Sequence, residues 1–189
     1  MSIQRAEKTN PLEGGPSFSL SNRIVRACWN VVWAICAWWT PPQFPSWRRM
    51  LLRLFGARIS STADIRSSVR IWLPSNLVME DYSCLGPRAN CYNMAMVTLR
   101  RYAVVSQNAH LCTGSHLVDD GHFQLVAKPI EISEYAWVAA DAFVGPGVKI
   151  GEGAVLGARG VAFCDLSPWT IYVGNPAMEK RTRKIIRKN

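Results

Sequence analysis

Hydrophobic side chains recur at every sixth position in the second half of the chain. The regular run consists of Ile132, Val138, Val144, Ile150 and Leu156. A small residue follows each of them, and a mostly small residue stands two positions before each. Helices repeat about every 3.6 residues and strands about every two, so neither element explains a period of six. The pattern therefore predicts a solenoid, in which every coil repeats the same corner.

The repeat continues upstream as three shorter sets. These sets are Ile59, Ile65 and Ile71; Met79, Leu85 and Cys91; and Leu99, Val105 and Leu111. Eight residues instead of six separate each set from the next, which predicts a two-residue bulge at a corner. The period fails for longer between Leu111 and Ile132, and we expect an extruded loop over residues 112–131.

Six residues per face and three faces per turn predict a triangular prism of about five coils over residues 57–173. The coils are expected to begin near Ile59, Met79, Leu99, Ile132 and Ile150. Aliphatic side chains would point inward, and the coils would stack about 4.8 Å apart. A β-sandwich would instead show a period of two, with turn signals about every eight to twelve residues. The predicted fold class is therefore an all-β solenoid.

The segments on either side of the repeat carry different signals. Residues 1–20 predict a flexible N-terminus, residues 21–56 a helical segment, and residues 174–189 a short basic tail. Residues 27–39 are apolar and rich in tryptophan, but a bilayer span needs about 20 such residues. Residues 47–55 indicate a short basic amphipathic helix. These helices would either cap the open end of the solenoid or lie in a membrane interface, because both uses need an apolar stripe.

Composition narrows the functional classes. With 49% hydrophobic and 19% charged residues the chain is globular, not disordered. The net charge of +9 suits phosphate, anionic lipid or nucleic acid, but nothing beyond charge indicates a nucleic-acid partner. Six cysteines without a CxxC pair indicate neither a disulfide framework nor a zinc site. A reducing cytoplasm is expected.

Three stretches resemble the hexapeptide-repeat acyltransferases: residues 137–148, 150–158 and the Gly-Asn-Pro-Ala turn at 174–177. Within that family, residues 47–57, 86–90 and 112–116 are most similar to the colanic-acid type of bacterial exopolysaccharide sugar O-acetyltransferases. The resemblance covers about residues 22–180. It implies a left-handed parallel β-helix, a homotrimer, acetyl-CoA as co-substrate, and a sugar or glycolipid acceptor.

Acyl transfer from a thioester to a hydroxyl needs a base near that hydroxyl and donors for the oxyanion. Histidine suits the role of base because its unperturbed pKa lies near neutrality. The chain has three histidines: His110, His116 and His122. His116 begins the extruded loop and matches the family's catalytic histidine in the Thr-Gly-Ser-His stretch, so it is the predicted general base. His110 is expected to face outward on a flat side, and His122 is the weaker second candidate.

Other site residues follow from the resemblance. Asn93 aligns with an acceptor-binding asparagine, although a corner asparagine is also expected where the backbone needs a positive φ. Asp119 and Asp120 would orient His116 or contact a sugar hydroxyl, or be exposed loop acids. In a groove between two prisms, Trp137 would flank the pantetheine arm of acetyl-CoA. Four small residues would let the backbone approach the cofactor closely, namely Ala139, Ala140, Gly157 and Ala158. The basic side chains of Lys180 and Arg181 would meet the nucleotide phosphates.

Two departures and two alternatives accompany this interpretation. Relatives often carry basic residues where this chain has Cys164 and Met178. A non-catalytic β-helix assembly module would explain that loss. A metal-dependent enzyme of the γ-carbonic-anhydrase type would explain the even spacing of the three histidines. However, side chains that stack on one face of the prism must be one full turn, about eighteen residues, apart, and these histidines are six apart. No bound metal is therefore expected. The preferred function is an acetyl-CoA-dependent sugar O-acetyltransferase of exopolysaccharide or lipid-linked oligosaccharide synthesis in the cytoplasm. Peripheral contact with the inner membrane surface is left open as one of the two uses of the N-terminal helices.

Overall fold

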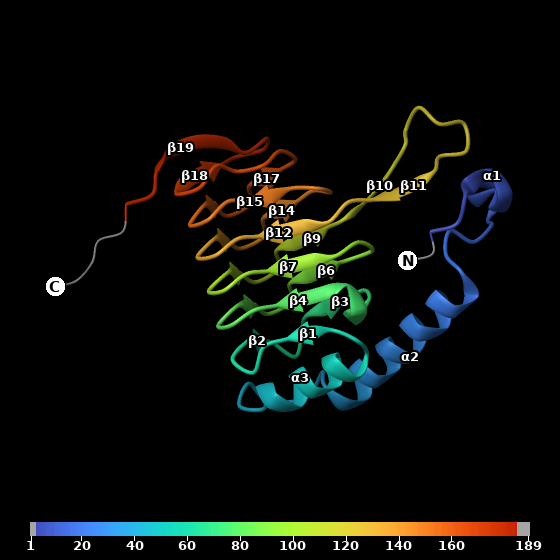
Figure 1. The fold of residues 1–189 in the computed structure, drawn as a ribbon, viewed down its shortest axis with the longest axis horizontal. Coiled ribbons are helices and arrows are strands. Elements are labelled where there is room, and N and C mark those ends of the chain that lie inside the picture. Colours follow the sequence, from blue (N-terminus) through green and yellow to red (C-terminus); the bar gives the residue numbers. More distant parts are fainter. Residues whose placement is uncertain (1–2, 185–189) are drawn as a thin grey trace.

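The computed structural model describes residues 3–184 and has the predicted triangular prism (Figure 1). Three parallel sheets form its sides. Face 1 contains β1 (Arg58–Ile59), β4 (Leu77–Met79), β7 (Val97–Leu99), β12 (Ile130–Ile132) and β15 (Lys149–Ile150). Face 2 contains β2 (Asp64–Ile65), β5 (Cys84–Leu85), β8 (Val104–Val105), β13 (Trp137–Val138), β16 (Val155–Leu156) and β18 (Thr170–Val173). Face 3 contains β3 (Arg70–Ile71), β6 (Asn90–Tyr92), β9 (His110–Cys112), β14 (Phe143–Val144) and β17 (Val161–Ala162).

The hexad aliphatics stack on one another inside the prism. On face 1 the paired residues are, in order, Ile59, Met79, Leu99, Ile132 and Ile150, which confirms the predicted coil starts. All five are buried. A partial sixth coil follows, because Leu166 bridges to Ile150 and β18 adds a sixth parallel strand to face 2. The core is therefore a single column of aliphatic side chains.

All three breaks in the hexad pattern lie at one corner of the prism, between face 3 and face 1. The first break is the 3-10 helix η2 (Pro74–Asn76), and the second is the turn at Met94 and Ala95. The third is the predicted excursion, which forms a hairpin of β10 (Gly114–His116) and β11 (Leu125–Ala127). Figure 1 shows this hairpin protruding from the coil stack. The inserted residues thus all lie at this corner, where they do not interrupt the pairing of strands within the three sheets.

Helices cover the lower end of the prism, beneath β1 and β2 in Figure 1. They are α2 (Leu20–Cys36) and α3 (Pro45–Leu54), preceded by α1 (Ala6–Thr9) and the 3-10 helix η1 (Pro11–Glu13). The indole N–H groups of Trp29 and Trp33 on α2 donate to the carbonyls of Ile71 and Ser67 in the first coil, at 2.7 and 3.1 Å. The capping role predicted for this segment is confirmed. Within the described residues, no helix combines the length and the hydrophobicity needed to cross a bilayer.

Arginines on α3 complete this cap. Arg48 is fully buried, and its Nε donates to the carbonyl of Ile65 at 2.6 Å. Its other nitrogens donate to the Thr40 hydroxyl and to the carbonyls of Pro41 and Pro42. Arg49 and Arg53 donate in the same way to the carbonyls of Ala63 and Ile59. These bonds satisfy carbonyls at the open end of the solenoid that have no coil beneath them.

The ends of the chain differ from the sequence expectation. The predicted flexible N-terminus contacts the hairpin, because the Gln124 side chain accepts from the N–H of Ala6 and donates to the carbonyl of Gln4. At the other end, β19 (Met178–Thr182) pairs antiparallel with β18. Residues 1–2 and 185–189, which belong to the predicted terminal segments, lie outside the described residues.

Candidate active site

His116 lies on β10, where the hairpin leaves the corner between face 3 and face 1. Its ring is nearly parallel to that of Phe123, with centroids 4.1 Å apart and an interplanar angle of 13°. Its Nδ1 lies 2.8 Å from the carbonyl oxygen of Phe123. A carbonyl only accepts, so Nδ1 carries the hydrogen, and the neutral ring keeps a lone pair on Nε2. This is the tautomer that a general base needs.

A cavity of about 250 Å³ lies beside this ring. Its walls come from the segment before α2, from the second coil and from the hairpin, namely Ser17, Phe18, Tyr92, Met94, Gly114, Ser115, His116 and Leu125. Phe18 is held by Trp72, whose ring centroid is 4.9 Å away and which in turn lies 5.9 Å from Tyr92. A Cβ at Gly114 would meet the terminal methyl of Met94, the flexible end of a side chain, so the hairpin and the second coil approach closely at this point.

Two of the polar residues predicted for the acceptor site have different environments. Both carboxylate oxygens of Asp120 accept from the hairpin backbone, from the N–H groups of His122 and Gln124 at 3.2 and 3.1 Å. Asp120 therefore shapes the hairpin tip, while Asp119 beside it is exposed. The hydrogen-bond partner that orients His116 is the Phe123 carbonyl instead of an aspartate.

Asn93 does not have the environment predicted for it. Its side chain is fully buried, accepts from the N–H of Leu73 at 3.0 Å and donates to the carbonyl of Leu73 at 2.8 Å. An amide suits this place because it satisfies a donor and an acceptor of one extended residue at once. Asn93 therefore ties two coils together at the corner, and a direct acceptor contact has no support in this geometry.

The predicted cofactor residues gather at a different corner from His116. Ala139 and Ala140 follow β13, and Gly157 and Ala158 follow β16, so all four lie between face 2 and face 3. The N–H groups of Ala139 and Gly157 donate to the next coil, which removes them as oxyanion donors. The other three residues are exposed: Trp137 on face 2, and Lys180 and Arg181 on β19. One chain alone does not bring these residues to His116.

Trp137 is oriented by a polar contact. Its ring is 43% exposed, and its Nε1–H donates to the Ser106 hydroxyl at 2.8 Å. The indole therefore lies against face 2 with its N–H satisfied, and it presents an apolar ring surface to any molecule that passes along that face.

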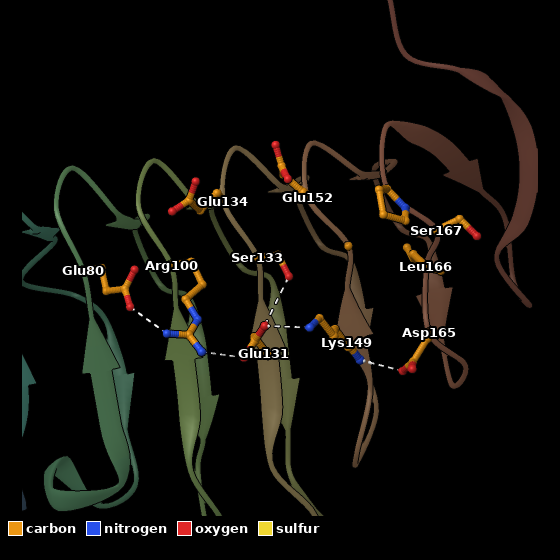
Figure 2. A pocket seen from close by; sticks show the side chains of 12 residues that line it. Glu80, Arg100, Glu131, Ser133, Glu134, Lys149, Glu152, Asp165, Leu166 and Ser167 are labelled. Atoms are coloured by element: carbon orange, nitrogen blue, oxygen red, sulfur yellow. Dashed lines mark hydrogen bonds and ion pairs between the residues drawn. The ribbon is translucent and has the colours of Figure 1, made fainter.

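A larger cavity, of about 680 Å³, lies on face 1 and is lined by a row of alternating charges (Figure 2). Arg100 bridges Glu80 and Glu131 at 2.8 and 2.9 Å, and Lys149 lies 3.1 Å from Glu131. Bonds to Glu80 and Glu131 raise the pKa of Arg100. Burial alone would raise the pKa of Glu131, but its bonds to Arg100 and Lys149 outweigh burial and lower the pKa. Because these charges are paired with one another, we assign this row to coil stacking.

The three histidines do not converge within one chain. His110 faces outward on face 3 as predicted, 3.4 Å from the Asn90 amide nitrogen and against the ring of Phe143, and burial lowers its pKa. His122 is exposed near the hairpin tip. Among residues 3–184, no group of three or more His, Cys, Asp or Glu side chains is placed to hold a metal ion. The γ-carbonic-anhydrase alternative therefore lacks a ligand set in the described chain.

Comparison with solved structures identifies the fold. A hexapeptide-repeat-containing acetyltransferase from Vibrio cholerae superposes with a TM-score of 0.80 at 19% identity, covering 88% of this chain and 95% of that one. A maltose O-acetyltransferase from Clostridium difficile 630 gives a TM-score of 0.78 at 17% identity, covering 88% and 90%. The V. cholerae protein has also been solved with acetyl-CoA. The fold is thus the left-handed β-helix of hexapeptide-repeat proteins, as predicted.

Sequence comparison identifies the family. A protein of Escherichia coli K12 that carries the name colanic acid biosynthesis acetyltransferase WcaF is 42% identical over 166 residues, which cover 88% of this chain and 91% of WcaF. The corresponding protein of Shigella flexneri matches equally. No family model matches the chain. The chain belongs to the family of hexapeptide-repeat acetyltransferases that includes WcaF, and the predicted enzyme class, an acyltransferase, is confirmed.

Proposed function

We propose that this enzyme transfers an acetyl group from acetyl-CoA to a sugar hydroxyl in bacterial exopolysaccharide or lipid-linked oligosaccharide synthesis, with His116 as general base. The observation that carries the proposal is the bond from Nδ1 of His116 to the Phe123 carbonyl, beside a cavity at the base of the hairpin. The name of WcaF supports the pathway, and the six free cysteines agree with a reducing cytoplasm.

The chemistry follows from the fixed tautomer. Nε2 of His116 accepts a hydrogen bond from the acceptor hydroxyl and takes its proton as the oxygen attacks the thioester carbonyl. The Phe123 carbonyl, which accepts from Nδ1–H, stabilises the imidazolium that results. When the tetrahedral intermediate collapses, the C–S bond breaks and His116 returns the proton to the departing thiolate. Proton and electron pairs balance without an acyl-enzyme.

The cavity beside His116 suits part of a sugar ring. Phe18 and Tyr92 provide aromatic surface, and Ser17 and Ser115 provide hydroxyl groups. Burial raises the pKa of Tyr92, so its phenol remains protonated and can donate at neutral pH. Exposed Asp119, on the same hairpin as His116, is proposed to accept from a sugar hydroxyl.

The donor site is proposed to form between two chains. His116 and the predicted cofactor residues occupy different corners, so a second copy must supply one of the two walls of the groove. Trp137, Ala139, Ala140, Gly157 and Ala158 would line the pantetheine arm, and exposed Lys180 and Arg181 would meet the nucleotide phosphates. A cyclic homotrimer would produce three such grooves from one type of contact.

The decisive experiment is thiol release from acetyl-CoA across a panel of sugar and glycolipid acceptors. His116→Ala should lower kcat by about 10²–10⁴-fold, the range expected for loss of a general base. His122→Ala, an exposed histidine on the same hairpin, is the matched control and should remain active. Full turnover by His116→Ala would refute the assignment of the base.

Two further measurements test the assembly and the donor. Light scattering should report a trimer, and an active monomer would contradict a groove shared by two chains. Calorimetry should detect CoA binding. Failure to bind CoA would instead favour a non-catalytic assembly module, which the uncharged Cys164 and Met178 positions also suit.

A further inference from the structure

Helix α2 has two apolar faces, although packing on the solenoid needs only one. The inner face carries Trp29 and Trp33, which are buried against the first coil. The outer face is exposed along its whole length and consists of Leu20, Ile24, Ala27, Cys28, Val31, Ala34 and Ile35. The helix therefore carries a second stripe that nothing in residues 3–184 covers.

The exposed stripe continues beyond α2. On α3, Leu51 and Leu52 face the prism, while Trp47, Met50 and Leu54 face outward. The turn between the helices adds Trp38, Trp39 and Phe44, with Trp39 71% exposed. We refer to these residues as the outer apolar face, namely Leu20, Ile24, Val31, Ile35, Trp38, Trp39, Phe44, Trp47, Met50 and Leu54. Single exposed apolar residues are common, but a contiguous group of this size marks an interaction surface.

Two of the outer tryptophans have already satisfied their polar atoms. The Nε1–H of Trp39 donates to the Ile35 carbonyl at 2.6 Å, and that of Trp47 donates to the Cys36 carbonyl at 2.7 Å. Burying either ring in an apolar medium therefore leaves no unpaired N–H. An apolar cavity of about 380 Å³ opens between Trp39, Phe44 and Trp47 on the same face.

The charge of the segment around the outer apolar face indicates what kind of surface it would bind. Residues 14–63 contain six arginines and neither Asp nor Glu. The arginines are Arg23, Arg26, Arg48, Arg49, Arg53 and Arg58. Arg48, Arg49 and Arg53 donate to carbonyls of the cap, whereas Arg23 and Arg58 are exposed. A segment without acidic residues that exposes arginines and tryptophans matches the interface of an anionic bilayer, where indoles lie among the headgroups and arginines approach phosphates.

We propose that the outer apolar face docks this enzyme on an anionic phospholipid surface, with α2 and α3 lying in the interface and not crossing it. Phe18, which lines the His116 cavity, comes two residues before α2 begins. Helix α2 runs from the hairpin side to the base of the prism (Figure 1), and its 17 residues span about 25 Å. Docking would hold the acceptor cavity within one helix length of the bilayer, where a lipid-linked acceptor is accessible.

The test is vesicle flotation of the full chain without acetyl-CoA or acceptor, so its outcome is independent of the proposed reaction. The wild type should float with vesicles of phosphatidylcholine and phosphatidylglycerol, less with phosphatidylcholine alone, and less at high salt. Ile35→Glu combined with Trp39→Glu should lower the bound fraction at least tenfold. Phe163→Glu, an equally exposed apolar position near the far end of the prism, is the matched control and should bind normally.

Several outcomes would overturn the proposal. Wild-type protein that stays with the soluble fraction would do so, as would a double variant that still floats. If the double variant instead lowers the oligomeric mass in light scattering without vesicles, the outer apolar face is a contact between copies of the chain. Should the variant fail to fold, quenching of wild-type tryptophan fluorescence by brominated phosphatidylcholine in anionic vesicles decides the matter, and absence of quenching overturns the proposal.

Discussion

His116 is held twice by one residue, since Phe123 both accepts its Nδ1–H at 2.8 Å and stacks its ring 4.1 Å away. Phe123 adopts a left-handed backbone conformation with φ of 52°, which is uncommon outside glycine. A backbone carbonyl carries a dipole and not a full charge, so it orients the imidazole without an ion pair. The hairpin therefore positions the proposed base through its own conformation.

Replacing Phe123 tests this positioning. Phe123→Leu keeps the carbonyl but loses the stacked ring, and we expect kcat to fall about tenfold with little change in the KM for acetyl-CoA, because a small displacement of the base is costly. Phe123→Tyr keeps the stacked ring and should remain close to wild type. Steady-state kinetics of the three proteins measures the effect, and equal kcat in Phe123→Leu would remove Phe123 from the mechanism.

Arg48 should be essential to the stability of the cap. Arg48→Met leaves the buried Ile65 carbonyl and the partly buried carbonyls of Pro41 and Pro42 without this donor, and it is expected to lower the free energy of unfolding by about 3 kcal/mol. Arg58→Met, at an exposed position on β1, should change it by less than about 0.5 kcal/mol. Urea denaturation followed by circular dichroism compares the two. Equal stability of both variants would show that the arginine cap contributes nothing.

The charge row on face 1 predicts a dependence of stability on acid. Burial raises the pKa of Glu131, but Arg100 and Lys149 lower it more, so the folded pKa lies below the unfolded one. Its stabilising contribution is present above the ordinary value of 4.5 and is lost as the pH falls through the lowered pKa. Glu131→Gln should therefore lose less stability than the wild type between neutral and acid pH. Thermal melts across this range measure the difference, which should stay within about 1 kcal/mol because the pairs are partly solvated.

The cysteines should react in order of exposure. Burial raises the pKa of the Cys91 thiol to about 12, whereas Cys28 and Cys164 are exposed. Alkylation needs the thiolate, so iodoacetamide at mildly alkaline pH should modify Cys28 and Cys164 and spare Cys91 until the protein unfolds. Peptide mass spectrometry reports each site. Labelling of native Cys91 as fast as Cys28 would show that the coil stack opens readily.

The stack of coils could be predicted from the sequence because every coil repeats the same spacing of inward residues along the chain. Ile132 pairs with Ile150 simply because both are inward residues of successive coils. It also located the hairpin through the loss of the hexad pattern. The partner of Asn93 was not predictable, since it depends on how a corner insertion leaves the Leu73 backbone. The sequence likewise indicated one apolar stripe for two alternative uses, whereas the structure shows α2 with one covered stripe and one exposed stripe, because which side is covered depends on the surface that the helix meets.

The hairpin that carries His116 enters and leaves the prism without shifting its register. Thr98 pairs with Glu131 across the inserted residues just as it pairs with Val78 in the coil below. The hairpin does not alter how the strands of face 1 pair, so its length or sequence can change at little cost to the stability of the coil stack. Grafting the corresponding hairpin of a relative would then be a direct route to re-targeting the enzyme to a different acceptor.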